Sequence, residues 1–491
     1  MSVPTSIKQL RKNRPSNGEK QPAALFVVSS VEMWERFSYY GMQAILVYYI
    51  YYASANGGLG LSPTTATTIV GLYGGTVYLT AVFGGWVSDR LLGVDRTIFI
   101  SAIIVLAGHL SLGFIPGITG LAIGLTLVAI GSGPLKCTAS TLVGSLYLPD
   151  DPRREPGFTI YYLGVNIGAF LGITLTALLQ KQWGFHVGFG AAALGMAIGL
   201  VTYAATRPIL APSTRSVDNP ASARETAMGV TLVGFIVLAV LALTMSGIIT
   251  INNSATILAL VSALIAGLYL WKILTSRSVT AAEKSHVRSY IPIFLASSFY
   301  FAMYLQVFTS IAVFADVRTD RRFFGFELPP STVIALAPIC TIALAPLAAI
   351  LWKRLGERQP SVGTKYAITL MIIGLSFVSL GVLSLNATAM LPILVLLAVI
   401  FLVNLADIVS SPAGLSFATK TSPHAFRSQM LSVHLLSAAI GSALSGALAQ
   451  FFNPETNAGQ YFMITGFAGI LGSIAIYLAA GWIKKQSRIS A

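Results

Sequence analysis

The chain has 491 residues, of which 55% are apolar and only 10% are charged, and its formal net charge is +14. Soluble domains carry about 25% charged residues, so this composition excludes a protein that faces water over most of its surface. The two cysteines, Cys137 and Cys340, lie far apart in apolar stretches, which excludes a disulfide-stabilised secreted domain.

The first residues are polar and basic, and no short apolar region of the signal-peptide type follows them, so we expect no cleaved leader. Apolar stretches of about 20 residues then recur along the chain. Lipid offers no partner for backbone polar groups, so each stretch is expected to be a helix. The fourteen predicted spans are 23–52, 64–88, 97–115, 118–146, 157–180, 185–206, 227–248, 254–274, 290–315, 331–352, 364–385, 389–419, 427–452 and 460–483.

The lysines and arginines outside these spans predict the side that each loop faces. With the N-terminus in the cytoplasm, 25 of the 31 basic residues fall in cytoplasmic segments, and four fall in outer segments, namely Lys181, Arg318, Arg321 and Arg322. This is the positive-inside pattern, so we expect both termini in the cytoplasm. Topology and contact with anionic lipid explain the net charge without nucleic acid as a partner.

A short motif occurs twice and indicates two related halves. It reads GGWVSDRLLG at 84–93 and LWKRLG at 351–356, in each case across the end of a predicted span. Two parallel halves with a site between them at mid-membrane are typical of one large class of transporters. We therefore expect a cytoplasmic tail at 1–22, a six-helix bundle at 23–206, a linker with two additional helices at 207–289, a six-helix bundle at 290–483 and a cytoplasmic tail at 484–491.

Six polar side chains share one face of the first span, because they follow helical offsets from i to i+11. They are Glu32, Glu35, Arg36, Tyr39, Tyr40 and Gln43. A structural ion pair between Arg36 and one glutamate would leave one acid and two tyrosines unexplained. Ionisable residues inside a membrane are costly and mark functional sites, so we interpret the stripe as functional.

One base and one acid lie inside the spans of opposite halves. Lys136 follows the sequence GSGPL, and Asp407 precedes SSPAG. Glycine and proline allow a helix to bend and to approach a neighbour closely. The pair could form a gate that opens when a proton or ligand neutralises the acid. A permanent buried salt bridge is the alternative.

Other polar groups in the spans are less specific. Asn166 lies among glycines and tyrosines and could contact a ligand, or could join two helices by a hydrogen bond. We expect His109 to be a satisfied packing residue rather than a proton relay. The tyrosines at 48, 49, 51 and 52 are typical in part of an interfacial belt. No nucleotide-binding, metal-binding or hydrolase motif is present, so we expect neither an enzyme nor a cofactor, and transport would have to use an ion gradient.

At 32–41 the sequence EMWERFSYYG resembles the first-span signature of the proton-coupled oligopeptide transporter family, E-x-x-E-R-F-x-Y-Y-G, at every fixed position. Residues 161–168 resemble a second family signature, F-Y-x-x-I-N-x-G. The resemblance implies a major-facilitator fold with two extra spans between the halves. It also implies proton coupling by Glu32, Glu35 and Arg36, and a cytoplasmic-side gate formed by Lys136 and Asp407 that contacts peptide termini. The implied substrate site is lined by Tyr39, Tyr40, Gln43, Tyr78, Lys136, Asn166, Gln306 and Asp407.

The sequence departs from the family pattern at several positions. Gln43 stands where the family has arginine, and Leu305, before Gln306, stands where it has glutamate, so both charges of an outer-side ion pair are missing together. Ala337 replaces an expected asparagine, and an expected tryptophan is absent near His434. The outer gate, the proton stoichiometry and part of the pocket are therefore expected to differ.

Together these features predict a multi-pass protein of the plasma membrane, the inner membrane in a bacterium. We expect a symporter that imports di- and tripeptides, with peptide-like zwitterions, protons and the lipid bilayer as partners and no obligate protein partner. Two alternatives stay open: a family member with a non-peptide substrate and altered coupling, and a sensor that binds substrate without transporting it.

Overall fold

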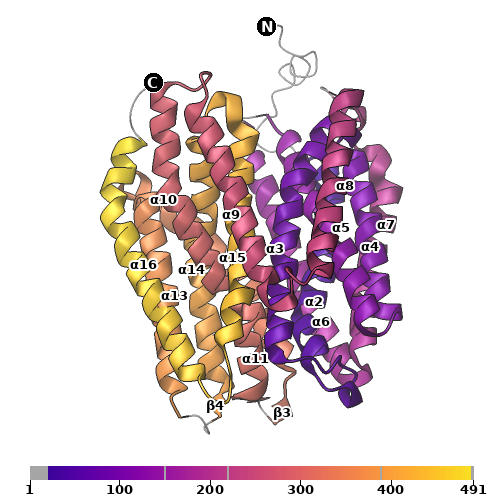
Figure 1. Ribbon diagram of the computed structural model, residues 1–491. Coiled ribbons are helices and arrows are strands. Elements are labelled where there is room, and N and C mark those ends of the chain that lie inside the picture. The colour runs from indigo at the N-terminus through magenta and orange to yellow at the C-terminus, as the bar shows by residue number, and fades with distance from the viewer. Residues whose placement is uncertain (1–19, 149–150, 218–219, 324, 387–389, 488–491) are drawn as a thin grey trace.

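A computed structural model describes residues 20–148, 151–217, 220–323, 325–386 and 390–487 of the chain; most of the predicted tail 1–22 lies outside these ranges. Early and late parts of the sequence form two groups of helices (Figure 1). The first group, the N-half, comprises α2 (Ala23–Tyr51), α3 (Pro63–Val87), α4 (Val94–Phe114), α5 (Gly117–Ser145), α6 (Arg154–Trp183) and α7 (Phe185–Thr206).

The second group, the C-half, begins with a span that is broken into α10 (Ala281–Tyr304), η5 (Leu305–Phe308) and α11 (Ser310–Val317). It continues with α12 (Leu336–Leu355), α13 (Val362–Leu383), α14 (Ile393–Lys420), α15 (Arg427–Leu448) and α16 (Ala458–Gln486). Between the halves lie α8 (Ala223–Met245) and α9 (Ile251–Thr275). The short helical turns are η1 (Ser54–Asn56), η2 (Ser88–Leu92), η3 (Arg207–Ile209), η4 (Pro212–Arg215), η6 (Pro330–Ala335), η7 (Gly356–Arg358), η8 (His424–Phe426) and η9 (Ala449–Phe451).

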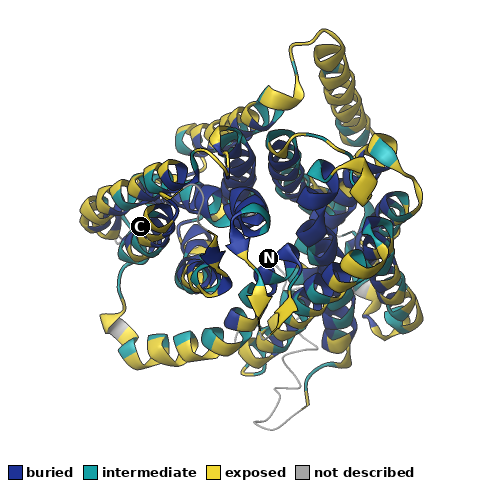
Figure 2. Cartoon of the chain, turned by 90° about the horizontal axis from the view of Figure 1, so that it is seen from below, coloured by how far each residue is buried: buried dark blue, intermediate teal, exposed yellow. Residues whose placement is uncertain are grey.

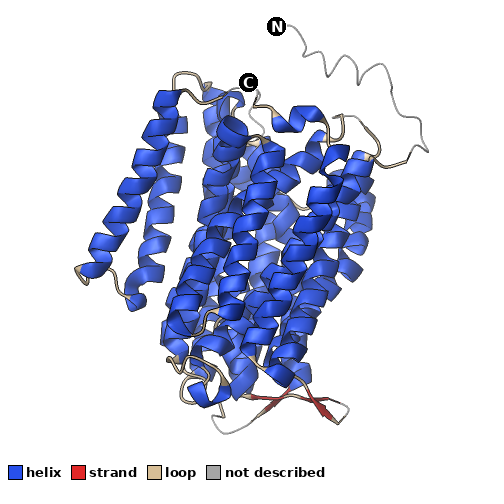
Figure 3. Ribbon diagram, turned by 90° about the vertical axis from the view of Figure 1, so that its right-hand side faces the viewer, coloured by secondary structure: helices blue, strands red, loops and turns tan. Residues whose placement is uncertain are grey.

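Four two-residue strands lie together at one end of the bundle (Figure 3). Strand β1 (Thr319–Asp320) pairs in parallel with β4 (Leu391–Pro392), and β2 (Arg322–Phe323) pairs antiparallel with β3 (Phe326–Glu327). We call this end the strand end and the opposite end, where α16 finishes, the terminal end (Figure 1). The positive-inside pattern predicts that the terminal end faces the cytoplasm.

The predicted spans are confirmed in number and place. Among the described residues, thirteen helices are long and apolar enough to cross a membrane. Helix α2 is the fourteenth long helix, and it carries the three charges of Glu32, Glu35 and Arg36 in its middle. The largest difference is at α10, which begins at Ala281 rather than at 290, because Thr280 and Glu283 form a capping box before the apolar part of the helix.

The two halves meet closely where α3 packs along α15. A side chain added at Gly71 would place its Cβ atom 2.5 Å from the Cα atom of Gly446, so both helices need glycine at this crossing. The hydroxyl of Ser442 donates to the carbonyl oxygen of Gly71 at 3.1 Å. Small residues allow such close approach between membrane helices, and Figure 2 shows the buried residues concentrated inside the bundle.

A buried acid fixes the start of the linker after α7. Asp95 on α4 is 0% exposed. It accepts a hydrogen bond from Tyr203 at 2.9 Å and pairs with Arg207 at 2.8 Å and with Arg215 at 3.3 Å. The start of the predicted linker 207–289 is therefore attached to the N-half by a charged cluster. The predicted span 97–115 began too late to include this acid.

Helix α8 has no buried face. None of its described residues is buried, and the α8–α9 hairpin stands at the side of the bundle (Figure 3). Its contacts with the N-half lie near its first turns, where Glu225 pairs with Arg90 at 3.1 Å and Gly229 lies beside the Trp86 ring. Helix α9, in contrast, packs against α3 and α15.

Candidate transport site

The charged residues of α2 form one buried cluster. The Nε atom of Arg36 lies 2.9 Å from a carboxylate oxygen of Glu32 and 2.7 Å from one of Glu35. The three residues are 2%, 0% and 3% exposed for Glu32, Glu35 and Arg36. Arg36 thus pairs with both acids of the stripe, and the cluster carries one net negative charge when both acids are ionised. We call these three residues the charge cluster.

Hydrogen bonding inside the charge cluster is incomplete. Among the described residues, Oε1 of Glu35 and Oε2 of Glu32 have no hydrogen-bond partner, while Oε2 of Glu35 lies 2.7 Å from Arg36 Nε as an ion pair. Buried polar atoms are normally paired, and unpaired ones are often found where a site performs a function. Both carboxylates therefore have lone pairs free to accept a proton.

Aromatic rings continue the stripe from α2 toward the other half. The Arg36 guanidinium lies 5.4 Å from the centre of the Tyr39 ring and 5.9 Å from that of Tyr40. Tyr39 stacks on Tyr73 of α3, and Tyr40 stacks on Phe308 of η5. Tyr40 is thus in contact with the C-half at the broken span.

Lys136 and Asp407 lie on opposite halves and do not form an ion pair in the described structure. The Lys136 ammonium lies 4.5 Å from the centre of the Tyr78 ring, a cation–π contact. Asp407 accepts a hydrogen bond from Tyr300 on α10. Helices α5 and α14, which carry the two charges, do not pack side by side. The gate pair is therefore separated in this conformation, and its closure in another conformation stays a prediction.

The helices that carry these two charges are continuous. Helix α5 runs through Pro134 and α14 runs through Pro412 without a break. The interrupted span is instead α10–η5–α11, where Thr309 leaves the helical conformation with φ −121° and ψ −100°. The apolar pattern predicted one continuous span at 290–315, because no proline or glycine marks the break.

The predicted site residues divide into two groups by exposure. Tyr40, Tyr78, Lys136, Asn166 and Asp407 are partly exposed. The members that are buried are Glu32, Glu35, Arg36, Tyr39, Gln43 and Gln306. The first group keeps some solvent-accessible surface in this conformation, whereas the second group has almost none.

Three amides predicted to contact substrate differ in their surroundings. Asn166 donates to the carbonyl oxygen of Tyr162 in its own helix at 2.8 Å. Gln306 is 0% exposed and accepts a hydrogen bond from Tyr461 of α16 at 3.1 Å, so substrate does not reach it here. The Oε1 atom of Gln43 is buried without a partner among the described residues.

The two membrane histidines are unlike each other. His434 lies 3.0 Å through Nδ1 from the Tyr290 hydroxyl. His109 is 0% exposed, and neither of its ring nitrogens has a partner among the described residues. The expectation that His109 is a packing residue with satisfied hydrogen bonds is therefore wrong in one respect. The side chain is fully buried, but its ring nitrogens have no hydrogen-bond partner among the described residues.

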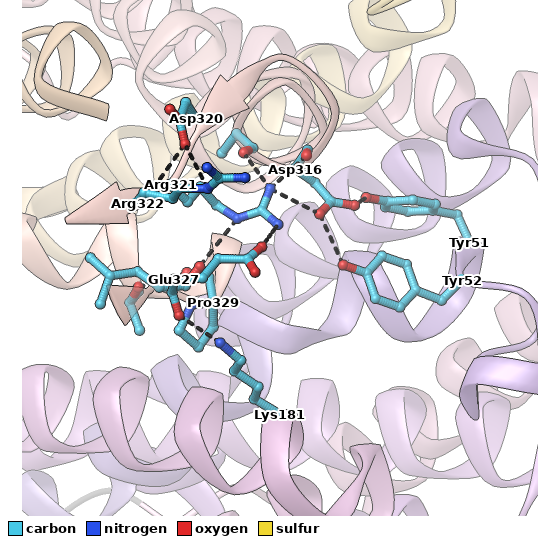
Figure 4. Close-up of polar contacts among 12 residues, drawn as sticks. Tyr51, Tyr52, Lys181, Asp316, Asp320, Arg321, Arg322, Glu327 and Pro329 are labelled. Atoms are coloured by element: carbon cyan, nitrogen blue, oxygen red, sulfur yellow. Dashed lines mark hydrogen bonds and ion pairs between the residues drawn. The ribbon is translucent and has the colours of Figure 1, made fainter. Parts of the chain in front are cut away.

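A group of polar contacts at the strand end was not predicted. Tyr51 and Tyr52 of the N-half both donate to Asp316 on α11, and Arg321 pairs with the same carboxylate at 3.3 Å (Figure 4). Their sequence positions suggested only an interfacial belt of tyrosines. The structure shows that at least two of these tyrosines connect the halves.

Two helical halves around buried charges, with cation and anion on facing sides, define a secondary transporter of the major-facilitator fold. Residues 95–466 match the profile of the POT family. The chain belongs to the POT family, and it is a multi-pass membrane protein.

Relatives match over nearly the whole chain. The uncharacterized transporter YclF of Bacillus subtilis (strain 168) is 37% identical over 465 residues, covering 93% of this chain and 94% of the relative. The di-/tripeptide transporter of Lactococcus lactis subsp. lactis (strain IL1403) is 36% identical over 480 residues, covering 95% of this chain and 96% of the relative.

Solved structures share the fold. The peptide transporter POT in complex with sulfate superposes with a TM-score of 0.91 at 36% identity, covering 98% of this chain and 99% of that one. A POT family transporter in complex with 5-aminolevulinic acid has a TM-score of 0.90 at 29% identity, covering 96% of this chain and 99% of that one.

Proposed function

We propose that the protein is a proton-coupled symporter that imports di- and tripeptides by alternating access. The observation that carries this proposal is the division of charges between an accessible pair and a buried cluster. Lys136 and Asp407 are partly exposed on opposite halves, so they can receive the carboxylate and the ammonium group of a zwitterion. The charge cluster lies out of reach of the solute and can hold a proton.

The relatives support peptides as the substrate class. Relatives named di-/tripeptide transporters match over more than nine-tenths of the chain. The aromatic side chains of Tyr40, Tyr78 and Phe301 offer apolar surface to peptide side chains of different size. Contacts of this kind discriminate weakly between apolar groups, which suits a carrier of many different peptides.

Uptake into proteoliposomes tests the proposal. The purified full chain is reconstituted, and uptake of labelled dialanine is measured with and without an inward proton gradient. We expect uptake above equilibrium with the gradient and none after addition of a protonophore. Lys136→Ala should abolish driven uptake. Lys365→Ala is the matched control, because Lys365 also lies over a ring, that of Trp352 at 4.1 Å, but sits on α13 away from the accessible pair.

A second candidate function keeps the transport mechanism and changes the solute. It is favoured by the relative bound to 5-aminolevulinic acid and by the missing charges at Gln43 and Leu305. Competition of labelled dialanine uptake by 5-aminolevulinic acid and by a panel of peptides separates the two. Binding of a solute without either driven uptake or counterflow of that solute would support a sensor.

A further inference from the structure

A groove lies between α13 and α16 on the surface of the C-half. These two helices pack side by side (Figure 1), and the groove has a volume of about 320 Å³. Its walls are formed by Ile368, Met371 and Ile372 of α13 and by Ile474 and Tyr477 of α16. Three of these side chains are exposed, so the groove opens toward the surroundings of the bundle and not toward the pathway between the halves.

The groove is suited to hydrocarbon and not to peptide. Of its lining side chains only three carry a polar atom, and two of these atoms are already bonded. The Ser473 hydroxyl donates to the carbonyl oxygen of Ala367 at 2.6 Å, and the Thr364 hydroxyl lies 2.9 Å from the hydroxyl of Ser361. A peptide would bury amide groups there without partners, which costs free energy, whereas an acyl chain carries no such groups.

The place of the groove along the helices matches one leaflet of a bilayer. The α13 side of the groove runs from Thr364 to Ile372, and α13 begins at Val362. At about 1.5 Å per residue, the groove ends roughly 15 Å from the start of this helix, which is half of a hydrocarbon core of about 30 Å. The groove therefore lies in the leaflet at the terminal end, which the positive-inside pattern predicts to be the cytoplasmic leaflet.

Two lysines follow the groove at the level where the headgroup of a lipid in this leaflet would lie. Helices α13 and α16 meet at Gly363, where an added Cβ atom would lie 3.0 Å from the Cα atom of Ala480. Lys484 and Lys485 come four and five residues after Ala480, roughly 6–8 Å further along the axis, and both are exposed. They also lie seven and eight residues after Tyr477, and such offsets place side chains on one helical face.

The charge of the neighbouring segments favours an anionic headgroup. Residues 353–365 and 480–487 contain six basic residues and one acid, Glu357. Lys365 is already engaged, because its ammonium group lies 4.1 Å from the centre of the Trp352 ring and donates to Gln359 at 3.1 Å. Basic residues next to a membrane attract anionic lipids, so we assign the headgroup contacts to Lys484 and Lys485.

Another protein chain is too large to fill the groove. One turn of helix, about 10 Å across and 5.4 Å long, occupies roughly 400 Å³, which is more than the volume of the whole groove. An acyl chain is unbranched and much narrower than a helix. The size of the groove therefore favours a lipid over a helix of a second copy of this chain.

We propose that the groove between α13 and α16 binds a phospholipid with an anionic headgroup. One acyl chain lies in the groove, and the headgroup lies at Lys484 and Lys485. The site is separate from the charge cluster and from the pair Lys136 and Asp407, so the proposal goes beyond transport and does not depend on the proposed substrate. A lipid held in this way should bind to the chain even outside a membrane, in mild detergent.

Native mass spectrometry of the purified full chain tests the proposal. The delipidated protein is titrated in detergent with dioleoylphosphatidylglycerol and, separately, with dioleoylphosphatidylcholine, which has the same acyl chains but no net charge. We expect one molecule of the anionic lipid to bind roughly tenfold more tightly than the zwitterionic lipid, because two lysines attract its charge. Equal affinities for the two lipids, or retention of a second copy of the chain in place of lipid, would overturn the proposal.

Lys484→Gln with Lys485→Gln tests the headgroup contacts. This double variant should bind the anionic lipid roughly tenfold more weakly and the zwitterionic lipid as the wild type does. Lys272→Gln with Arg277→Gln is the matched control, because it removes two exposed positive charges at the end of α9 and just after it. If the control weakens binding as much, the preference comes from overall charge and the assigned site is wrong.

Ile474→Trp tests the place of the acyl chain, because the larger side chain would fill the groove. This variant should lose the tightly bound lipid molecule. Leu478→Trp is the matched control, since Leu478 is 77% exposed on the same helix and does not line the groove. Ile368→Trp fills the groove from the α13 wall and is used if Ile474→Trp lowers the midpoint of thermal unfolding. Wild-type binding by the filling variant, or equal loss in the control, would exclude the groove as the site.

Discussion

Arg36→Met removes the single cation that pairs with two buried acids of α2. The methionine fills a similar volume, so the main change is electrostatic. Glu32 and Glu35 would then lie within one helical turn of each other, 2% and 0% exposed, with no counter-charge inside the cluster. We expect a large loss of stability at neutral pH that becomes smaller as the pH falls.

The size of the loss is bounded by two physical costs. Removing one partner of a buried ion pair costs about 3–5 kcal/mol. The variant can avoid part of this cost by protonating the acids. A glutamate with a pKa of about 4.3 in water costs about 4 kcal/mol to protonate at pH 7, so two cost about 7 kcal/mol. The less costly route sets the loss, so we expect about 3–5 kcal/mol at pH 7, shrinking by about 1.4 kcal/mol per pH unit for each acid that is protonated.

Unfolding of the purified protein in detergent, followed by tryptophan fluorescence at several pH values, measures this effect. The triple variant with Glu32→Gln and Glu35→Gln added should recover most of the stability, since neutral replacements of buried ion pairs are often well tolerated. Arg90→Met is the control for loss of an exposed pair, because Arg90 and Glu225 are 28% and 51% exposed, and it should cost at most about 1 kcal/mol. A variant at Arg36 as stable as the wild type at pH 7, or equally destabilised at every pH, would refute the reasoning.

Three further predictions concern transport and the outer gate. Lys136→Ala should lower gradient-driven uptake at least about tenfold, and normal uptake at a normal expression level would exclude its role in binding. Glu35→Gln keeps shape and hydrogen bonding but cannot release a proton, so it should leave counterflow measurable and prevent accumulation against a gradient; accumulation by this variant would exclude Glu35 as the coupling acid. Leu305→Glu should lower thermal stability by burying an unpaired acid, and adding Gln43→Arg should restore part of that stability. If the two effects simply add in a double-mutant cycle, residues 43 and 305 do not interact.

Most of the fold was predictable because lipid imposes the same requirement on every span. Each helix must be long, apolar and internally hydrogen-bonded, so its sequence is recognisable without knowledge of its neighbours. The exceptions are local. The polar start of α10 depends on the capping box of Thr280 and Glu283, and the break at 305–309 occurs in the sequence LQVFT, which has neither glycine nor proline.

The site was predictable only where one helix builds it. The charge cluster follows from the spacing of Glu32, Glu35 and Arg36 on α2, since offsets of three and four place side chains on one face. The contact of Tyr51 with Asp316 joins residues 265 positions apart. Tyrosines near a membrane surface are common for reasons of solvation alone, so nothing in their local sequence distinguishes the two that connect the halves.

Because α8 stands apart from the bundle, its tilt angle is expected to depend on the thickness of the bilayer. Its 23 residues span roughly 35 Å at about 1.5 Å per residue, slightly more than the hydrocarbon core of about 30 Å. A helix packed in the bundle cannot adjust its tilt alone, whereas α8 is held near its first turns and can lean until its apolar length matches the lipid. In thinner membranes α8 should tilt further from the bilayer normal while the two halves keep their orientation. Its tilt angle would therefore depend on the thickness of the host membrane rather than on the step of the transport cycle.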